Sequence, residues 1–281
     1  MDWQTLEDEF GDVVGKARRG QEMTPDDLAA RAGISTATLA AIERYETIPD
    51  SQVVRRLADA LGLDAAKLQG SAQETFFPAA PCGTDHGVLM VQMLNLGQSF
   101  NVNGYVIGCR QTGTGAVIDP GADADSLMQA VNRAGLRIDQ ILMTHGHQDH
   151  TGALAAIRAA TGAPARIHPA DLAAQKGLQD LVDGEIAADE TITVGGQRLL
   201  VRSIPGHTAG CICLIHAQAA FVGDILFAGS LGGTRSRERY FGQIDGVSRY
   251  LLSLEDHVVL YPGHGPATTV GEEKANNPFF R

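Results

Sequence analysis

Residues 144–152, "THGHQDHTG", place three histidines and an aspartate in six consecutive positions. The whole chain contains nine histidines, so a third of them lie in this one short segment. The apolar run "IDQILM" before it predicts a β-strand, and ligand sites in α/β proteins tend to lie at strand ends. His145 and His147 are two residues apart, so both imidazoles can face one metal ion. Asp149 and His150 follow directly and can turn to a second ion about 3.5–4 Å away.

Three later stretches carry further metal-compatible side chains at strand ends. These are His207 in "PGHTAG", Asp224 in "FVGDILF" and His264 in "YPGHGP". A polar loop with chance histidines is the alternative, but it would crowd polar groups that have no evident partners. The remaining histidines lack such settings and are expected at the surface or in a linker: His86, His168, His216 and His257.

The pattern H-x-H-x-D-H, with single downstream His, Asp and His residues, resembles the ligand set of the metallo-β-lactamase superfamily from residue 88 to about residue 270. Strand and helix signals alternate over this range, which indicates an α/β or mixed α+β domain. The resemblance implies a four-layer αβ/βα sandwich with the metals between the edges of two sheets. The implied ligands are His145, His147 and His207 for the first metal, Asp149, His150 and His264 for the second, and Asp224 as the bridge.

The resemblance also implies how the site works. Asp119 in "VIDPG" matches the family's carboxylate that holds a ligand histidine. We expect two divalent ions per chain, zinc first, with iron or manganese as alternatives. Metal-bound water ionises near neutral pH and replaces a serine or cysteine nucleophile, so Asp149 and Asp224 are the expected catalytic residues. Cys211 and Cys213 take no ligand position and are expected to be buried thiols, and the lack of a cysteine at the bridging position argues against a true zinc β-lactamase.

Four stretches resemble the short, single-domain relatives of glyoxalase II, which hydrolyse thioesters of the glutathione type. They are "THGHQDHTG", "PGHTAGCICL", "GDILFAGSLGG" and "YPGHGPATTVGEEKANNPFF". The longer enzymes bind glutathione with a helical C-terminal domain, and we expect this chain, whose sequence ends at Arg281, to be of the short type without it. In "GGTRSRERYFGQ", Arg235, Arg237 and Arg239 are candidates to bind a substrate carboxylate as paired donors. The alternative for this stretch is a solvated surface loop.

Three functions therefore stay open. The first is a dinuclear hydrolase acting on a thioester or related ester, with lactone or phosphodiester hydrolysis as variants. The second is a persulfide dioxygenase that uses one iron held by His145, His207 and Asp224, because that branch of the superfamily keeps the same motif. The third is a transcription regulator whose metal domain senses a metabolite.

The first seventy residues predict a series of short helices with caps. "TPDDLAARAG" has Thr24 as N-cap and a terminal glycine, and "STATLAAIERYE" begins at Ser35 or Thr36. Residues 10–69 resemble the lambda-repressor/Cro-type (XRE) helix-turn-helix domain through "LAARAGIS", "ER" and "LADALGLDAAKL". In that family the second helix of the pair reads the DNA major groove. The resulting DNA-contact candidates are Ser35, Thr36, Thr38 and Arg44.

Charge and residue type argue against DNA binding by this module. Its second helix offers no Gln, Asn or Arg among its early residues, and Tyr45 stands where the family usually has glycine. Residues 1–75 hold eight Lys and Arg against fourteen Asp and Glu, within a chain of net charge −11. An acidic module gains little from counterion release on nucleic acid. The alternative is a module that pairs two chains or docks a partner, and we expect a homodimer.

The expected organisation is a helix-turn-helix domain over 1–70, a linker over 71–87 and a hydrolase domain over 88–281. The acidic start "MDWQTLEDEF" has no apolar core of a signal peptide, and no run of eighteen apolar residues predicts a membrane span. Four scattered cysteines do not suggest a disulfide framework. We therefore expect a soluble, cytoplasmic protein with a small-molecule substrate.

Overall fold

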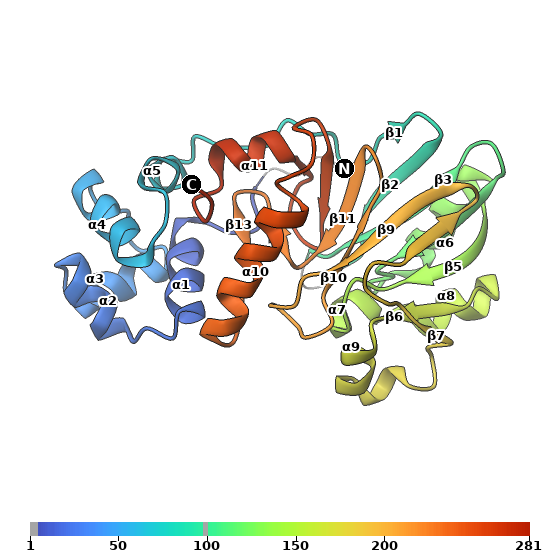
Figure 1. Cartoon of the computed structure of the whole chain (residues 1–281), viewed down its shortest axis with the longest axis horizontal. Coiled ribbons are helices and arrows are strands. Elements are labelled where there is room, and N and C mark those ends of the chain that lie inside the picture. The colour runs from blue at the N-terminus through green and yellow to red at the C-terminus, as the bar shows by residue number, and fades with distance from the viewer. Residues whose placement is uncertain (1–4, 98–100) are drawn as a thin grey trace.

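The computed structural model describes residues 5–97 and 101–281, so the first residues of the acidic start lie outside the described part. Figure 1 shows a bundle of short helices at one end of the molecule and a layered α/β part at the other. No described helix has both the length and the apolar composition needed to cross a membrane.

The N-terminal helices form where the capping signals predict them. Thr24 caps one helix by accepting a hydrogen bond from the backbone of Asp27, and Ser35 caps the next by accepting one from Thr38. Gly33 ends a helix in the left-handed conformation, as predicted. The helices are α1 (Phe10–Gly20), α2 (Pro25–Ala32), α3 (Thr36–Glu43), α4 (Ser51–Leu61) and α5 (Ala65–Ala72).

Tyr45 follows α3 with a φ of 62°, in the left-handed region that favours glycine. This explains why a glycine is usual at the matching position of the helix-turn-helix family. The Tyr45 hydroxyl donates a hydrogen bond to the Asp12 carboxylate, which ties the strained residue to α1. The side chain thereby acquires a contact that glycine cannot make.

The first sheet has seven strands in sequence order, β1 to β7, antiparallel from β1 to β4 and parallel from β4 to β7. Its strands are β1 (Asp85–His86), β2 (Leu89–Asn95), β3 (Asn103–Cys109), β4 (Thr114–Ile118), β5 (Arg137–Leu142), β6 (Ala165–Ile167) and β7 (Gly184–Glu185). The accompanying helices are α6 (Ala124–Ala134), α7 (Gln148–Thr151), α8 (Leu154–Thr161), α9 (Pro169–Ala174) and the 3₁₀ turn η1 (Lys176–Leu178). Apolar residues of α6 and α8 pack on this sheet.

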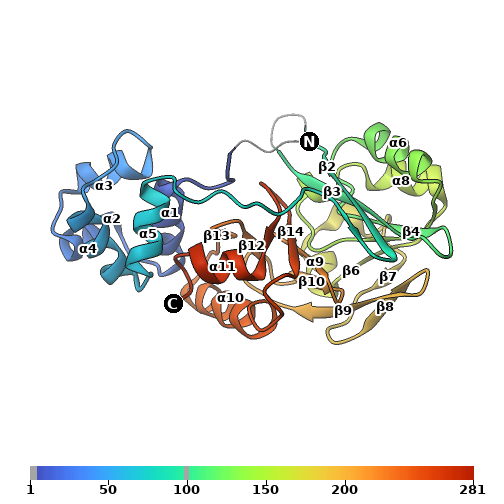
Figure 2. The same ribbon diagram turned by 90° about the horizontal axis from the view of Figure 1, so that it is seen from above.

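The second sheet has six strands in the order β15-β14-β11-β10-β9-β8, and β12 and β13 form a separate hairpin. The strands are β8 (Thr191–Val194), β9 (Gln197–Ser203), β10 (Ile212–Ile215), β11 (Ala219–Gly223), β12 (Leu226–Phe227), β13 (Ser230–Leu231), β14 (Val259–Pro262) and β15 (Thr268–Thr269). The helices on this side are α10 (Arg237–Tyr250) and α11 (Val270–Asn276). In Figure 2, α6 and α8 lie on one outer side of the sheets and α10 and α11 on the other.

The core between the two sheets is built from inward-facing strand residues, which confirms the four-layer αβ/βα architecture. Tyr105, Phe221 and Tyr261 form its aromatic centre, with ring centroids 5.2 to 5.6 Å apart. Offset and edge-to-face ring contacts of this kind stabilise a core beyond the area they bury. Both sheets end at the same edge, and this shared edge carries the candidate site.

The helical part packs directly on the α/β part. One continuous apolar cluster joins residues of α1 to α5 with residues of α10 and α11. The backbone N–H of Asp64 donates to the carbonyl of Pro278 at 2.8 Å, and Lys67 Nζ donates to the carbonyl of Lys274 at 2.7 Å. Gly20 lies so close to the Tyr240 ring that a Cβ there would overlap it. The irregular segment between α5 and β1 spans 73–84, within the predicted linker.

The interpretation of "GGTRSRERYFGQ" as a surface loop is wrong, because α10 begins at Arg237 inside this stretch. Ser236 caps the helix, and Tyr240, Gln243 and Val247 form its buried face. The helix continues to Tyr250. Its charged residues Arg237, Glu238 and Arg239 are exposed on the solvent side of the helix.

Candidate metal centre

The predicted ligands lie in the segments that follow strands at the shared sheet edge. His145 and His147 follow β5, and α7 carries Asp149 and His150. His207 lies between β9 and β10, Asp224 directly after β11, and His264 two residues after the end of β14. Strands of both sheets thus deliver ligand side chains to one place, although the residues span 120 positions of the chain.

Four side chains form the first cluster. His207 Nε2 lies 2.9 Å from His147 Nδ1, and His145 Nε2 lies 3.1 Å from the same atom. The ligand atoms of these three histidines and of Asp224 all lie within 4.8 Å of one another. Three imidazole nitrogens and one carboxylate at this spacing are a donor set suited to zinc or another first-row divalent metal.

The second cluster is formed by Asp149, His150 and His264. His150 Nε2 lies 3.3 Å from His264 Nε2, and Asp149 Oδ2 lies 3.4 Å from His264 Nε2. His264 is oriented from behind, because its Nδ1 faces the backbone carbonyl of Asn101 at 2.5 Å. A histidine whose second nitrogen is fixed in this way presents the other nitrogen to the site.

Asp224 belongs to the first cluster and also lies close to the second. Its Oδ2 is 3.3 Å from His207 Nε2 and 3.6 Å from His264 Nε2. Its Oδ1 is 3.3 Å from His150 Nε2. No partner that meets the criteria of a hydrogen bond is found for this buried oxygen among the described residues. A buried carboxylate oxygen without a donor is unfavourable, and a divalent cation would satisfy it. The side chains present therefore fit metal ions.

The electrostatics of the site keep its carboxylate charged and one of its imidazoles neutral. Burial opposes ionisation of Asp224, but His150 and His145 beside it hold its pKa well below the usual range. Burial lowers the pKa of His145 well below its usual value. Burial also acts to lower the pKa of His150, but Asp224 and the hydrogen bond to Asp119 raise it instead. A neutral imidazole and an ionised carboxylate are the forms that bind metal.

Asp119 is fully buried behind the site and has a φ of 49°, which is uncommon for a residue other than glycine. Its Oδ1 accepts a hydrogen bond from the backbone N–H of Thr144 at 2.7 Å, and its Oδ2 accepts one from the Thr144 hydroxyl at 2.6 Å. Oδ2 also faces His150 Nδ1 at 3.3 Å. This arrangement joins the end of β4 to the segment 144–150 and orients His150.

Asp171 on α9 organises the site but was not predicted. It is buried, and its carboxylate accepts hydrogen bonds from Gly146 N and Gly210 N at 2.8 Å each and from Thr208 Oγ1 at 2.7 Å. It therefore connects the loop that carries His145 and His147 with the loop that carries His207. In sequence it is one acidic residue in the first turn of a helix, which is an ordinary helix-capping preference and no signal of a site.

Gln243 on α10 was also missed. Its Oε1 accepts a hydrogen bond from the backbone N–H of His207 at 2.7 Å, and its Nε2 donates to the carbonyls of Ile225 and Gly232. The side chain is fully buried. The one sequence signal for Gln243 is a glutamine on an otherwise apolar helix face. This signal is visible only after the helix itself has been predicted.

Gly263 has no side chain and thereby leaves room for the side chains of Asp224 and His150. A Cβ at this position would overlap Asp224 Oδ1 and lie 2.6 Å from His150 Cε1. We expect Gly263→Ala to displace both side chains and to lower metal affinity by about 10–100-fold, the usual effect of disturbing ligand orientation. Equilibrium dialysis against zinc measures this. Gly242→Ala on α10 is the control, because nothing lies within 4 Å of its Cβ; unchanged affinity in Gly263→Ala would refute the steric argument.

The arginines predicted to bind substrate are all exposed at the start of α10. The Arg237 guanidinium lies 5.1 Å from the centre of the Phe241 ring and 3.5 Å from the carbonyl of Gln21. It is therefore turned toward the helical part. A substrate contact by Arg235, Arg237 or Arg239 stays a prediction.

The cysteines behave as predicted. Cys211 and Cys213 are buried and unpaired, and burial raises the pKa of each thiol to about 12. Neither thiol belongs to a cluster of metal-ligand atoms within the described residues. Both side chains therefore serve packing.

The predicted DNA-contact residues are exposed at and around α3. Thr36 donates a hydrogen bond to Asp26 at 2.6 Å, and Arg44 forms paired hydrogen bonds with Glu46 at 2.8 and 2.9 Å. Ser35 and Thr38 bond to one another. These local partners compete with any phosphate or base, so DNA contact by these residues stays a prediction, as does dimerisation.

Residues 98–264 match the family model of the metallo-beta-lactamase superfamily. The chain belongs to the metallo-beta-lactamase superfamily. Residues 14–68 match a helix-turn-helix family model, so this superfamily member carries a helix-turn-helix domain at its N-terminal end.

Relatives and solved structures agree with this assignment. The hydroxyacylglutathione hydrolase GloC of Haemophilus influenzae is 32% identical over 183 residues, which cover 59% of this chain and 86% of the relative. The BLEG-1 B3 metallo-beta-lactamase structure has a TM-score of 0.58 and 27% identity, over 68% of this chain and 99% of that one. The structure of TTHA1623 in a di-iron-bound form has a TM-score of 0.52 and 30% identity, over 67% of this chain and 99% of that one.

Proposed function

We propose that this protein is a metal-dependent hydrolase that cleaves a thioester of the hydroxyacylglutathione type at a dinuclear centre. One observation carries the proposal: two clusters of metal-ligand atoms adjoin one another, and Asp224 of the first also lies close to the second. If only one ion were bound, at the first cluster, the three side chains of the second cluster would lie close together without a common partner, which is unfavourable.

The proposed ligands follow the two clusters. His145, His147 and His207 would hold one ion, Asp149, His150 and His264 the other, and Asp224 would bridge them. Zinc is the first candidate, with iron or manganese as alternatives, because these donors accept all three. The relative TTHA1623, observed in a di-iron-bound form, supports a two-ion site in this branch of the superfamily.

Other residues of the chain hold the proposed metal ligands in position. Two bound divalent cations would supply water activated near neutral pH and stabilise the oxyanion that develops on the substrate carbonyl. Asp119 holds the imidazole of His150, and Asp171 holds the two loops that carry the first cluster. Asp149 and Asp224 would provide the negative charge that holds both cations. Fixed side chains of this kind lower the reorganisation needed during the reaction.

The substrate class is supported by the relative GloC, a hydroxyacylglutathione hydrolase that matches this chain over 86% of its length. The test is elemental analysis of the purified full chain, followed by assays with S-D-lactoylglutathione, a lactone, a phosphodiester and a β-lactam. We expect about two metal ions per chain and preferential turnover of the thioester. Preferential turnover of another substrate would keep the metal centre and refute the thioester assignment.

The persulfide dioxygenase alternative is tested in the same preparation. A single iron held by His145, His207 and Asp224 would consume oxygen in the presence of glutathione persulfide. Oxygen uptake with one iron per chain and no thioester hydrolysis would contradict the proposal. Two ions per chain without oxygen uptake support it.

A further inference from the structure

A pocket of about 490 Å³ lies at the seam between the helical part and the α/β part. We call it the seam pocket; its lining residues lie within 5–11, 42–48 and 71–77, with Gly229 and Asn276 from the α/β part. None of the seven side chains of the candidate metal centre lines it. The volume is that of an ordinary small-molecule site, and sites of this kind favour domain boundaries.

Apolar side chains around the seam pocket remain in contact with solvent. Within the described residues, the exposed large apolar side chains are those of Tyr45, Ile48, Phe77 and Phe241, at 55, 60, 47 and 45% of their full exposure. Three of these four line the pocket. Exposed apolar groups gathered around one cavity mark a binding site, whereas isolated ones do not.

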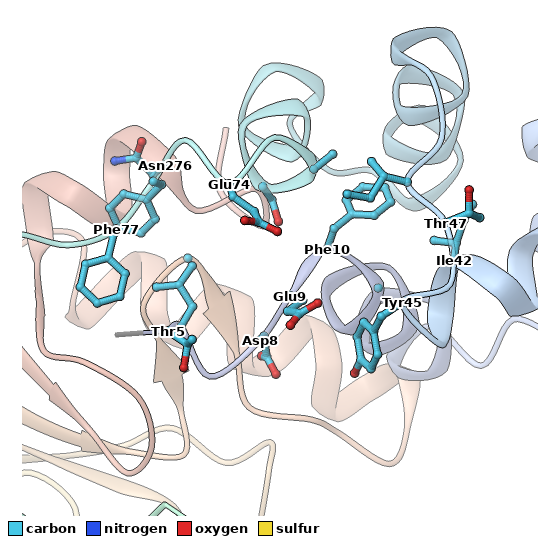
Figure 3. Close-up of a pocket in the computed structure, with 17 residues that line it drawn as sticks. Thr5, Asp8, Glu9, Phe10, Ile42, Tyr45, Thr47, Glu74, Phe77 and Asn276 are labelled. Atoms are coloured by element: carbon cyan, nitrogen blue, oxygen red, sulfur yellow. The ribbon is translucent and has the colours of Figure 1, made fainter. Parts of the chain in front are cut away.

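The charged side chains among the described residues that line the seam pocket are all acidic. Asp8, Glu9 and Glu74 line it, whereas no lysine or arginine is found among the described residues that line it. Asp8 is paired with Lys16, but no ion pair of Glu9 or Glu74 is formed within the described chain. Figure 3 shows the three carboxylates between Phe77 on one side and Phe10 and Tyr45 on the other.

Aromatic rings combined with carboxylates are the chemistry that recognises organic cations. A ring face attracts a cation, and a carboxylate neutralises it. Four aromatic side chains line the pocket: Phe10, Tyr45, Phe76 and Phe77. An anionic ligand would face the carboxylates of Glu9 and Glu74, and none of the described lining residues is a lysine or arginine that could bind it.

We propose that the seam pocket binds a small organic cation with an aromatic or branched aliphatic body, such as a primary amine. Such a ligand places its apolar body against the exposed rings and its ammonium group between the carboxylates. It touches α1, the α3–α4 connection and the α/β part together. The site is independent of the metal centre, so this proposal stands whatever the hydrolase acts on.

The test is a ligand-observed NMR titration of the metal-loaded full chain with 2-phenylethylamine, a cation at neutral pH. Phenylacetate is the matched probe, because it has the same ring and the opposite charge. We expect the amine to bind at least about tenfold more tightly than phenylacetate. Glu74→Gln and Phe77→Ala each remove one recognition group at an exposed position, and each should weaken amine binding about threefold to fivefold.

Two variants elsewhere on the surface serve as matched controls. Glu255→Gln and Phe241→Ala alter an exposed carboxylate and an exposed ring that do not line the seam pocket. Both should leave amine binding unchanged. Equal binding of the amine and phenylacetate, or equal losses in the pocket and control variants, would overturn the proposal.

Discussion

Replacement of Asp224 by alanine is expected to abolish hydrolysis while the chain stays folded. The carboxylate lies within 3.3 Å of both His207 and His150, so its removal takes a shared ligand from both clusters. We expect kcat/KM to fall by about 10³-fold or more, which corresponds to ~4 kcal/mol of transition-state stabilisation. Metal content should fall from about two ions per chain to one or fewer. Steady-state kinetics and elemental analysis of the same sample measure both.

Asp245→Ala is the matched control, because Asp245 is an exposed aspartate on α10. It should retain full activity and metal content. The circular dichroism of Asp224→Ala should match that of the parent chain, since in the metal-free protein the substitution removes a buried oxygen without a hydrogen-bond partner. An Asp224→Ala variant with two ions and undiminished turnover would remove Asp224 from the centre.

Asp171→Ala is expected to cause the largest loss of stability among the residues that support the site. The substitution leaves Gly146 N, Gly210 N and Thr208 Oγ1 without their acceptor in a buried place. Hydrogen bonds to a charged group contribute about 1.5–3 kcal/mol each and are not additive, so we expect the free energy of unfolding to fall by ~3–5 kcal/mol. Zinc affinity should fall by about 10–100-fold, because both loops of the first cluster lose their anchor.

Urea unfolding of the metal-free chain measures the stability loss in Asp171→Ala, and zinc titration measures the affinity. Asp171→Asn should be intermediate, because the amide retains one acceptor oxygen but turns an N–H toward the remaining donors. The exposed Asp180→Ala is the control in the same region. A stable Asp171→Ala variant with unchanged zinc affinity would show that the loops hold their positions without this carboxylate.

The motif residues were predictable because their signal is local. Histidines and aspartates within a few positions of one another, at the end of an apolar strand, define a chemistry before any tertiary contact is known. The same holds for the helix caps: Thr24 and Ser35 accept backbone hydrogen bonds from residues three positions away. The buried face of α10 was not predictable in this way, because that face includes Gln243. A glutamine is expected to be exposed to solvent until its hydrogen-bond partners are known.

Sequence alone determined the ligand types, the superfamily resemblance and the helix-turn-helix pattern, since each depends on residues that are near neighbours or recur at set intervals. Only the tertiary structure decided that Asp171 anchors two ligand loops, that α1 packs on α10, and that an acidic, aromatic pocket opens between the two parts. These features join segments that are far apart along the chain. Their formation depends on which surfaces are buried together, and no local pattern of residues records that choice.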